Sequence, residues 1–258
     1  MNKIIFFDLD QTIYDHDTNQ IPSETKKLLE TLHQMPNVKL GIASGRSYQK
    51  LNIIKSILYM FDYFVLINGG IVYQKQHMLF DYPISIPDIS NIQKEAFKHR
   101  VNVGMVGAHQ EALSYKDPRA SYEHVGLQFF NPIVDEKLYL KTKIYQLWLI
   151  GDTLEDIESF AAKYPSFKLY LWRRGGSDFL YEHVNKAKSI KRLLESEKEY
   201  QLICIGDGFN DIQMIEMADI GIAMGNARTD ELIKKADLVA PHIRDNQLFD
   251  FFKKEKLI

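Results

Sequence analysis

The chain has 258 residues, 45% hydrophobic and 26% charged, which excludes an intrinsically disordered protein and leaves room for two small domains. Its formal net charge of −2 gives no bulk attraction to nucleic acid or acidic lipid, so neither is expected as a partner. The only cysteine, Cys204, excludes an intrachain disulfide and fits a reducing, cytoplasmic location.

Short apolar runs alternate with amphipathic stretches over the first third of the chain. Ile4–Phe7 predicts a buried strand that is too short, and too soon followed by acid, to be a signal peptide. Pro22 and Pro36 bound a predicted helix with apolar residues at helical spacing. Two more strands are predicted at Val38–Ala43 and Phe64–Ile67, and a helix is predicted between them at residues 51–58. None of these runs is long enough to span a membrane.

The last third repeats this scheme. A helix carries Ile190 and Leu193, and Leu202–Ile205 predicts a strand that ends at a glycine-framed acidic loop. Further strands are predicted at Ile220–Ala223 and Leu238–Ala240, around a helix near residues 230–235. Strand–helix alternation of this kind predicts an α/β fold, a doubly wound and mostly parallel Rossmann-like sheet covered on both faces.

The middle of the chain has a different pattern. Strands are predicted at residues 101–106, 145–150, 167–171 and 179–183, with helices at 89–99 and 154–163. This pattern predicts an α+β unit inserted between two halves of one sheet domain. We therefore expect a discontinuous sheet domain of residues 1–81 and 185–258, and an inserted α+β domain of residues 82–184. A monomer or a small homo-oligomer is expected.

Four polar clusters follow predicted strands or precede a predicted helix. They are Asp8–Thr12, Ser44–Arg46, the Lys186 region and Gly206–Asp211. In an open parallel sheet, ligands bind beyond the carboxyl ends of the strands, near the point where the strand order reverses. Clusters that are distant in sequence are therefore expected to meet at one end of the sheet.

Such a meeting would bring together four carboxylates, whose mutual repulsion requires a cation. Hard oxygen ligands suit Mg²⁺, which often bridges to a substrate phosphate. Lys186 and Ser44, with backbone N–H groups at loop and helix starts, would hold phosphate oxygens. One carboxylate could then attack phosphorus while another transfers protons. The four carboxylates are Asp8, Asp10, Asp207 and Asp211.

The ordered set resembles the haloacid dehalogenase-like phosphatase superfamily, and specifically its Cof-type branch. That family has Asp-x-Asp-x-Thr, Ser/Thr-Gly-Arg, Lys and Gly-Asp-x-x-Asn-Asp in this order, and all four elements are present here. The resemblance covers the whole chain, because the inserted middle has the position and length of the larger cap type. It implies a cytoplasmic, Mg²⁺-dependent phosphatase that hydrolyses a small phosphorylated metabolite, such as a sugar, nucleotide or cofactor phosphate.

The resemblance also implies roles for the acidic residues. Asp8 would be the nucleophile and a Mg²⁺ ligand. Asp10 would be the general acid and base, with its backbone carbonyl on the metal, and Asp207 would supply a further carboxylate to Mg²⁺. Asp211 is expected to support the water molecules around the metal, and Thr12 to orient the acid loop by a hydrogen bond.

The phosphate ligands implied by the resemblance come from all four clusters. They are the backbone N–H of Leu9, together with Ser44, Gly45, Lys186 and Asn210.

Two positions depart from the family pattern, and two further features lie outside it. Gln11 stands where the family usually has glycine, and Ala187 where glycine often follows the lysine; both put the rate in doubt more than the reaction class. Asp15 and His16 are expected on the surface of the loop after Thr12. The Arg173–Arg174 turn is a solvated turn or a contact to an anionic substrate.

Two alternatives use the same chemistry. A phosphomutase or phosphotransferase would pass the phosphoryl group to a sugar hydroxyl instead of water, although the cap position favours hydrolysis. A non-catalytic module, such as a receiver-like switch or a metabolite binder, would also hold acidic residues and Mg²⁺. Receivers, however, carry their acceptor after a later strand, and binding alone does not require Asp10.

Overall fold

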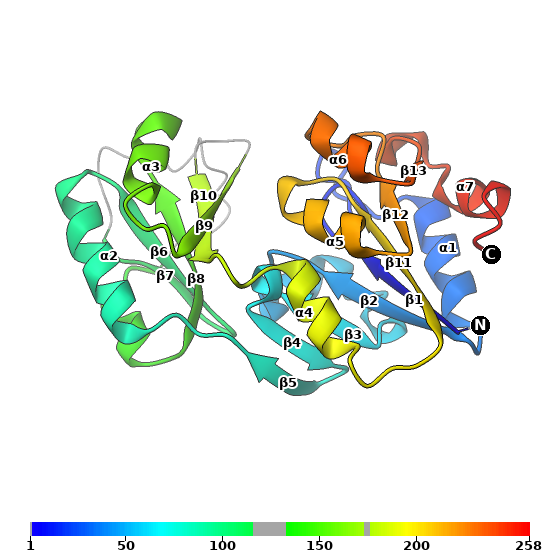
Figure 1. Cartoon of the computed structure of the whole chain (residues 1–258), viewed down its shortest axis with the longest axis horizontal. Coiled ribbons are helices and arrows are strands. Elements are labelled where there is room, and N and C mark those ends of the chain that lie inside the picture. The colour runs from blue at the N-terminus through cyan, green and yellow to red at the C-terminus, as the bar shows by residue number, and fades with distance from the viewer. Residues whose placement is uncertain (1, 116–132, 173–175) are drawn as a thin grey trace. The chain divides into compact units, whose positions relative to one another are not determined.

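The computed structural model describes residues 2–115, 133–172 and 176–258, and the chain divides into two compact units (Figure 1). Unit 1 comprises residues 1–46, 50–80 and 185–258, and unit 2 comprises residues 47–49 and 81–184. The short segment 47–49, expected in the core domain, groups with unit 2. Arg173 and Arg174, named above as a basic turn, lie outside the described residues.

Unit 1 contains an eight-stranded sheet in the order β13-β12-β11-β1-β2-β3-β4-β5. From β13 to β3 neighbouring strands pair in parallel, and β4 pairs antiparallel with β3. The strands are β1 (Asn2–Phe7), β2 (Val38–Ala43), β3 (Tyr63–Leu66), β4 (Ile71–Gln74), β5 (His77–Asp81), β11 (Tyr200–Gly206), β12 (Ile220–Ala223) and β13 (Leu238–Val239).

Helices cover both faces of this sheet, as successive side chains of β1 show. Phe6 belongs to a buried cluster with Ile190 and Met214, which come from helices on one face. Phe7, on the opposite face, stacks on Phe252 with ring centroids 6.4 Å apart. The first face carries α4 (Lys186–Leu193), α5 (Ile212–Met217) and α6 (Asp230–Lys235), and the second carries α1 (Ser23–His33) and α7 (Leu248–Lys254) (Figure 1). The predicted doubly wound, mostly parallel α/β fold is therefore confirmed.

The strand order reverses between β1 and β11. From β1 the chain proceeds through α1 to β2 and then β3 on one side, whereas from β11 it proceeds to β12 and β13 on the other. The register pairs Phe7, the last residue of β1, with Ile205 near the end of β11. The residues that follow these two strands are thus placed at the switch point, where ligands bind in sheets of this kind.

One predicted element of unit 1 needs correction, and some observed elements were not predicted. The helix expected at residues 51–58 is a pair of 3₁₀ segments, Tyr48–Ile54 and Leu58–Met60, because apolar residues spaced by three and four fit either helix period. The strands β4 and β5 follow the third strand and were not predicted. Helix α7, whose phenylalanines are buried, was also not predicted.

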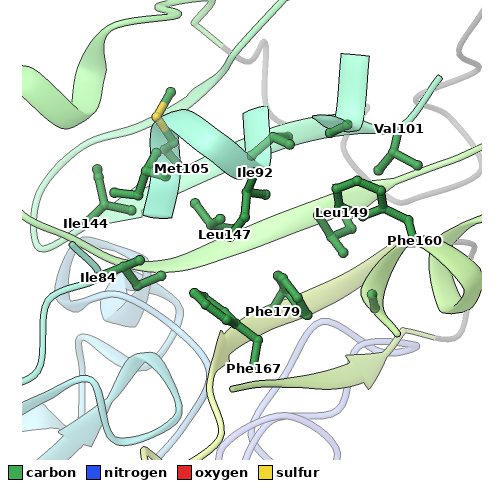
Figure 2. Close-up of a cluster of buried hydrophobic side chains, with 14 of the residues drawn as sticks. Ile84, Ile92, Val101, Met105, Ile144, Leu147, Leu149, Phe160, Phe167 and Phe179 are labelled. Carbon is green, nitrogen blue, oxygen red and sulfur yellow. The ribbon is translucent and has the colours of Figure 1, made fainter. Parts of the chain in front are cut away.

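Unit 2 is an α+β unit with a five-stranded sheet in the order β7-β6-β8-β10-β9, in which every pairing is antiparallel. Its core packs Met105, Leu147 and Phe179 from the strands against Ile92 and Phe160 from the helices (Figure 2). The elements are α2 (Ile86–Lys98), β6 (Asn102–Gly107), β7 (Glu111–Leu113), β8 (Ile144–Ile150), α3 (Leu154–Ala161), β9 (Phe167–Leu171) and β10 (Gly176–Tyr181).

Among the helices of residues 2–115, 133–172 and 176–258, none combines the length and the apolar character needed to cross a bilayer.

Candidate active site

Two carboxylates stand side by side at the switch point of the sheet. Asp8 follows β1 and Asp207 follows β11, and the backbone N–H of Asp8 donates to the carbonyl of Ile205 at 2.8 Å. Each of the two aspartates is only 5% exposed. Buried carboxylates need a charged partner or a metal. We therefore attribute the presence of two aspartates here to the chemistry of a site rather than to stability.

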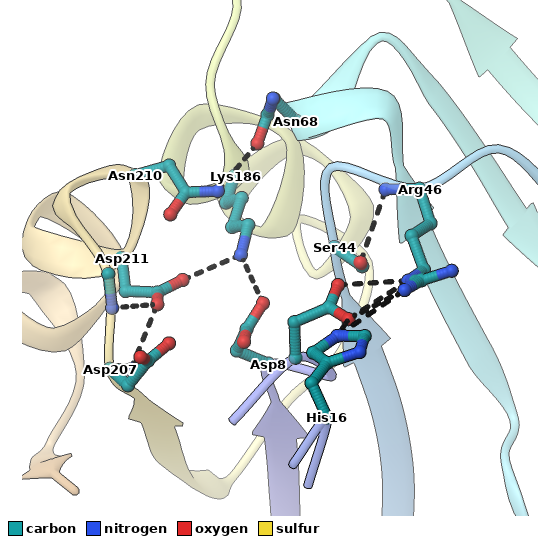
Figure 3. A network of polar contacts seen from close by, with 11 residues as sticks. Asp8, His16, Ser44, Arg46, Asn68, Lys186, Asp207, Asn210 and Asp211 are labelled. Atoms are coloured by element: carbon teal, nitrogen blue, oxygen red, sulfur yellow. Dashed lines mark hydrogen bonds and ion pairs between the residues drawn. The ribbon is translucent and has the colours of Figure 1, made fainter. Parts of the chain in front are cut away.

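Lys186 links Asp8 to the glycine-framed loop after β11. It is the first residue of α4, whose N-cap Asn185 accepts a hydrogen bond from the backbone N–H of Lys188 at 2.8 Å. The Lys186 Nζ lies 2.6 Å from Asp8 Oδ1 and 2.6 Å from Asp211 Oδ1, and the side chain is fully buried (Figure 3). Lys186 is therefore not a solvated surface lysine.

Asp211 organises the loop that carries Asp207. Its Oδ2 accepts hydrogen bonds from the backbone N–H groups of Asp207 at 3.1 Å and Gly208 at 2.8 Å, while its Oδ1 binds Lys186. A Cβ atom at Gly206 would lie 2.5 Å from the Asp211 carboxyl carbon, so only glycine lets the strand pass this close. Both oxygens of Asp211 are therefore engaged by the protein.

Burial and repulsion raise the pKa of Asp8 well above its ordinary value. Loss of hydration is the largest cause; Lys186 opposes it, and the charges of Asp211, Asp207 and Asp10 add to it. The pKa of Lys186 is also raised, because Asp211 and Asp8 outweigh the effect of its burial. Lys186 is therefore a fixed positive charge at neutral pH, whereas ionised Asp8 is held at a cost.

The chemistry of the donor set fits a divalent cation. Asp8, Asp207 and Asp211 each offer one carboxylate oxygen, and these three atoms lie within 4.8 Å of one another. Three carboxylates and one ammonium leave two negative charges in a buried volume, which Mg²⁺ would balance. Since the protein already engages Asp211, Asp8 and Asp207 are the carboxylates better suited to contact the ion.

Asp10 lies apart from this trio and contacts Arg46 and His16. The Arg46 Nε lies 3.0 Å and 2.9 Å from the two Asp10 oxygens, and its Nη2 lies 2.9 Å from Oδ1. The His16 Nε2 also contacts Asp10 Oδ1. The expectation of a surface position is wrong for Asp15, which is buried and accepts from the backbone N–H of Asp17 at 2.9 Å. It is correct for His16, which is exposed, but the contact of His16 with Asp10 was not expected.

The Arg46 contact sets the protonation of Asp10. Burial alone would raise the pKa of Asp10, but the Arg46 guanidinium, helped by the hydrogen bond from His16, holds it well below its usual range. The pKa of Arg46 is raised in turn, because Asp10 outweighs the effect of its burial. In this structure Asp10 is therefore a carboxylate, ready to accept a proton.

The two departures from the family pattern have different surroundings. Gln11 has φ 61°, in the left-handed region, which costs a residue other than glycine about 1–2 kcal/mol. Its conformation is held by its own N–H, which donates to the carbonyl of Tyr14 at 2.8 Å, and by Asn226, whose amide donates to the Gln11 carbonyl at 2.8 Å. Ala187 is buried in α4 and packs in the core cluster of unit 1.

The hydrogen bond expected from Thr12 is not observed. Thr12 is fully buried, but within the described residues its hydroxyl oxygen has no hydrogen-bond partner. Thr12 therefore contributes packing to the acid loop in this structure. The loop is shaped instead by backbone bonds from Ile13 and Tyr14 to the carbonyl of Leu9, at 3.0 Å and 2.8 Å.

The remaining predicted phosphate ligands belong to the same end of the sheet. Ser44 follows β2 and is fully buried, and its hydroxyl accepts from the backbone N–H of Arg46 at 3.2 Å, across Gly45. The Asn210 amide donates to Asn68 Oδ1 at 2.8 Å. Figure 3 shows Ser44, Lys186 and Asn210 arranged around Asp8, so elements distant in sequence contribute to one site.

Comparisons with known proteins give a family match over most of the chain. The model of the haloacid dehalogenase-like hydrolase family matches residues 5–252. The chain is 32% identical over 249 residues to "Putative phosphatase YkrA" of Bacillus subtilis strain 168, covering 95% of this chain and 94% of the relative.

Solved structures with the same fold cover the whole chain. A hypothetical protein of Geobacillus kaustophilus HTA426 is 29% identical, with a TM-score of 0.87 and full coverage of both chains. The protein BT4131, described as a subclass IIB sugar phosphatase, is 23% identical, with a TM-score of 0.84 and full coverage of both chains. The second likeness is one of fold alone.

Proposed function

Because the chain belongs to the haloacid dehalogenase-like hydrolases, we propose that it is a Mg²⁺-dependent phosphatase that hydrolyses a small phosphomonoester through a phosphorylated Asp8. The observation that carries the proposal is the buried trio of Asp8, Asp207 and Asp211 with Lys186 between two of them. Asp8 and Asp207 would hold Mg²⁺ with the backbone carbonyl of Asp10. When bound there, Mg²⁺ supplies positive charge that holds phosphoryl oxygens and keeps the carboxylates ionised.

The first half of the reaction transfers the phosphoryl group to the protein. A carboxylate oxygen of Asp8 forms a bond to phosphorus as the bond from phosphorus to the leaving oxygen breaks. Asp10 donates a proton to that leaving oxygen, so the alcohol departs neutral. Lys186, Ser44 and Asn210, with the backbone N–H of Leu9 and the Gly45 turn, would hold the phosphoryl oxygens during transfer.

The second half regenerates Asp8. Asp10, now a carboxylate, takes a proton from water as that water attacks phosphorus, and the bond from phosphorus to Asp8 breaks to release inorganic phosphate. The depressed pKa of Asp10 suits this step directly. For the first step its pKa must rise, and the negative charges of an arriving phosphomonoester act in that direction while competing for Arg46.

The test of this function is phosphate release from a panel of sugar, nucleotide and cofactor phosphates. We propose that unit 2 selects the leaving group. Sugar phosphates should be tested first, because BT4131, a protein with a similar fold, is described as a sugar phosphatase. Release should require Mg²⁺ and stop when the metal is chelated. Release that continues under chelation would contradict the metal dependence, and an isomerised sugar phosphate without free phosphate would identify a mutase.

Replacing Asp10 by asparagine should separate the two halves of the reaction. Without a proton donor, hydrolysis of an alkyl phosphate should slow by about 10²–10⁴-fold. With p-nitrophenyl phosphate, whose leaving group needs no proton, the variant should release a burst of nitrophenolate equal to the enzyme concentration and then stall as phospho-Asp8. Stopped-flow absorbance measures the burst, and Asp17→Asn, in the same loop, is the control expected to keep wild-type turnover.

Equal slowing of both substrates with no burst would contradict the assignment of Asp10 as the acid and base.

A further inference from the structure

We propose that Asn68 is a positioning residue for the phosphate site, acting through Asn210. Asn68 follows β3, a strand whose tip carries no residue implied by the family pattern, and its side chain is fully buried. Its Oδ1 accepts the hydrogen bond from the Asn210 amide at 2.8 Å (Figure 3). The inference deepens the proposed function and rests on it, because it concerns how a proposed phosphate ligand is held.

The backbone at this tip is strained over consecutive residues. Ile67 and Asn68 both have φ 53°, and Gly69 has φ 99°. Asparagine enters the left-handed region more readily than most residues, but a β-branched residue such as Ile67 rarely does. Strain of this kind persists only where surrounding structure enforces it, and it is concentrated at functional sites. The tip is therefore held in place by what it contacts.

The contacts of the tip lead to elements that carry proposed phosphate ligands. The N–H of Asn68 donates to the carbonyl of Ser44 at 3.0 Å, and the N–H of Ile67 donates to the carbonyl of Arg46 at 3.1 Å. On the other side, the hydroxyl of Ser189 in α4 donates to the carbonyl of Gly69 at 2.8 Å. The tip of β3 thus joins the Ser44 loop to the helix that begins with Lys186, and its Asn68 side chain adds the Asn210 loop.

Close packing fixes the tip against α4 as well. A Cβ atom at Gly69 would lie 2.5 Å from the carbonyl oxygen of Asn185, the residue before Lys186. A side chain there would displace the start of α4, and the left-handed φ independently favours glycine. The sequence Asn68-Gly69 is therefore required on two grounds, the amide for Asn210 and the glycine for the helix.

The chemistry of the amide explains why Asn210 needs such a partner. A primary amide can present either its oxygen or its NH₂ group to a ligand, and the two ends have nearly the same shape. An acceptor at Asn68 Oδ1 selects the orientation in which the NH₂ group of Asn210 faces it, and the planarity of the group then directs the second N–H. Without that acceptor, Asn210 can flip and present its oxygen to an anion, which repels it.

A double-mutant cycle tests this inference. Asn68→Gly removes the amide while keeping a residue that adopts the left-handed backbone, and Asn210→Ala removes the ligand itself. We expect Asn68→Gly to lower kcat/KM by about 10–100-fold and to weaken competitive inhibition by inorganic phosphate in the presence of Mg²⁺. Because Asn68 acts through Asn210, the double variant should be no worse than Asn210→Ala.

The matched control is Asn246→Gly. Asn246 also has φ 53° and uses its side chain, accepting from the N–H of Glu24 at 2.8 Å and donating to the hydroxyl of Ser23 at 2.9 Å. Asn246 lies just before α7 and its side chain bonds the start of α1, so it is not part of the site. Its variant should lose stability but keep the wild-type kcat/KM and phosphate inhibition, which separates a positioning role from a general loss of structure.

Independent effects of the two substitutions, or wild-type phosphate inhibition in Asn68→Gly, would overturn the inference. If Asn68→Gly does not fold, Asn68→Asp keeps both the left-handed preference and an acceptor, and Asn210→Ala should then cost as much in that background as in the wild type. A smaller cost there would equally contradict the role. A wild type that releases no phosphate from any substrate would instead contradict the proposed function.

Discussion

Asp8→Asn should abolish turnover and, in the absence of metal, make the protein more stable. Removing a nucleophile of this type should lower kcat by at least about 10⁴-fold, because asparagine lacks the carboxylate that is proposed to form the phosphorylated intermediate. The stabilisation follows from the raised pKa of Asp8, which shows that burial and its acidic neighbours make the ionised form unfavourable despite Lys186. Asparagine keeps the shape of the side chain without the charge.

The stability difference between Asp8→Asn and the wild type should depend on pH in a direction set by the raised pKa of Asp8. A carboxyl whose pKa is raised by folding contributes stability when protonated and loses that contribution as the pH rises through its folded-state pKa. The advantage of Asp8→Asn over the wild type should therefore be present at pH 7 and shrink as the pH falls toward the ordinary carboxyl pKa of about 4. Denaturant unfolding of the metal-free proteins at several pH values measures it.

Addition of Mg²⁺ should reverse the order of stability, because only the wild type retains the Asp8 carboxylate for the ion. Asp152→Asn, an exposed aspartate of unit 2, is the matched control and should change neither activity nor its Mg²⁺ response. Turnover near the wild-type rate in Asp8→Asn would sink the covalent mechanism, and a metal-free variant less stable than the wild type would show that the Lys186 ion pair outweighs burial.

The fold could be predicted because its signals are local. The buried runs at Ile4–Phe7 and Leu202–Ile205 are short, apolar and bounded by polar clusters, and parallel strands buried on both faces have this pattern. The helix expected at residues 51–58 failed because an eight-residue window cannot distinguish a 3₁₀ segment from an α-helix. The strand β5 was missed because its residues are exposed or only partly buried and do not alternate.

The charged residues of the candidate site could be predicted from the sequence, whereas residues that join the site only through the way the chain folds could not. Asp8, Lys186 and Asp211 were predicted as site residues because they are charged and lie near predicted strand ends or a helix start. In the structure they form one connected cluster. His16 was missed because its contact with Asp10 depends on how the loop between them folds back, which has no local signature. Asn68 did carry a signal, since Asn-Gly after a buried strand favours a left-handed turn, but it has no charge to suggest a role.

Lys186→Met should cause the largest loss of stability of any single substitution proposed for this site. Removing the buried ammonium leaves the carboxylates of Asp8 and Asp211 without their shared partner, and breaking a buried ion pair on one side costs about 3–5 kcal/mol. Activity should fall by about 10²–10³-fold as well, because the same group is proposed to hold the transferring phosphoryl oxygens. Denaturant unfolding and steady-state kinetics measure the two effects.

The pH dependence distinguishes lost charge pairing from lost packing. Because folding raises the pKa of Lys186, its contribution is complete below the ordinary lysine pKa of about 10.4 and is lost only as the pH rises through the folded-state pKa, so it is fully present at neutral pH. In Lys186→Met, the repulsion between the carboxylates of Asp8 and Asp211 can be relieved only by protonation of one of them. Its stability deficit against the wild type should therefore shrink as the pH falls from 8 toward about 5, whereas a deficit due to packing would not change.

Mg²⁺ provides the second discriminating measurement. With the ammonium gone, the buried volume holds three negative charges rather than two, so the ion should stabilise Lys186→Met by more than it stabilises the wild type. Lys188→Met changes an exposed lysine two residues farther along the same helix, and its responses to pH and metal should match those of the wild type. A deficit in Lys186→Met that matches that control, or that is the same at both pH values, would mean that Lys186 does not neutralise this cluster.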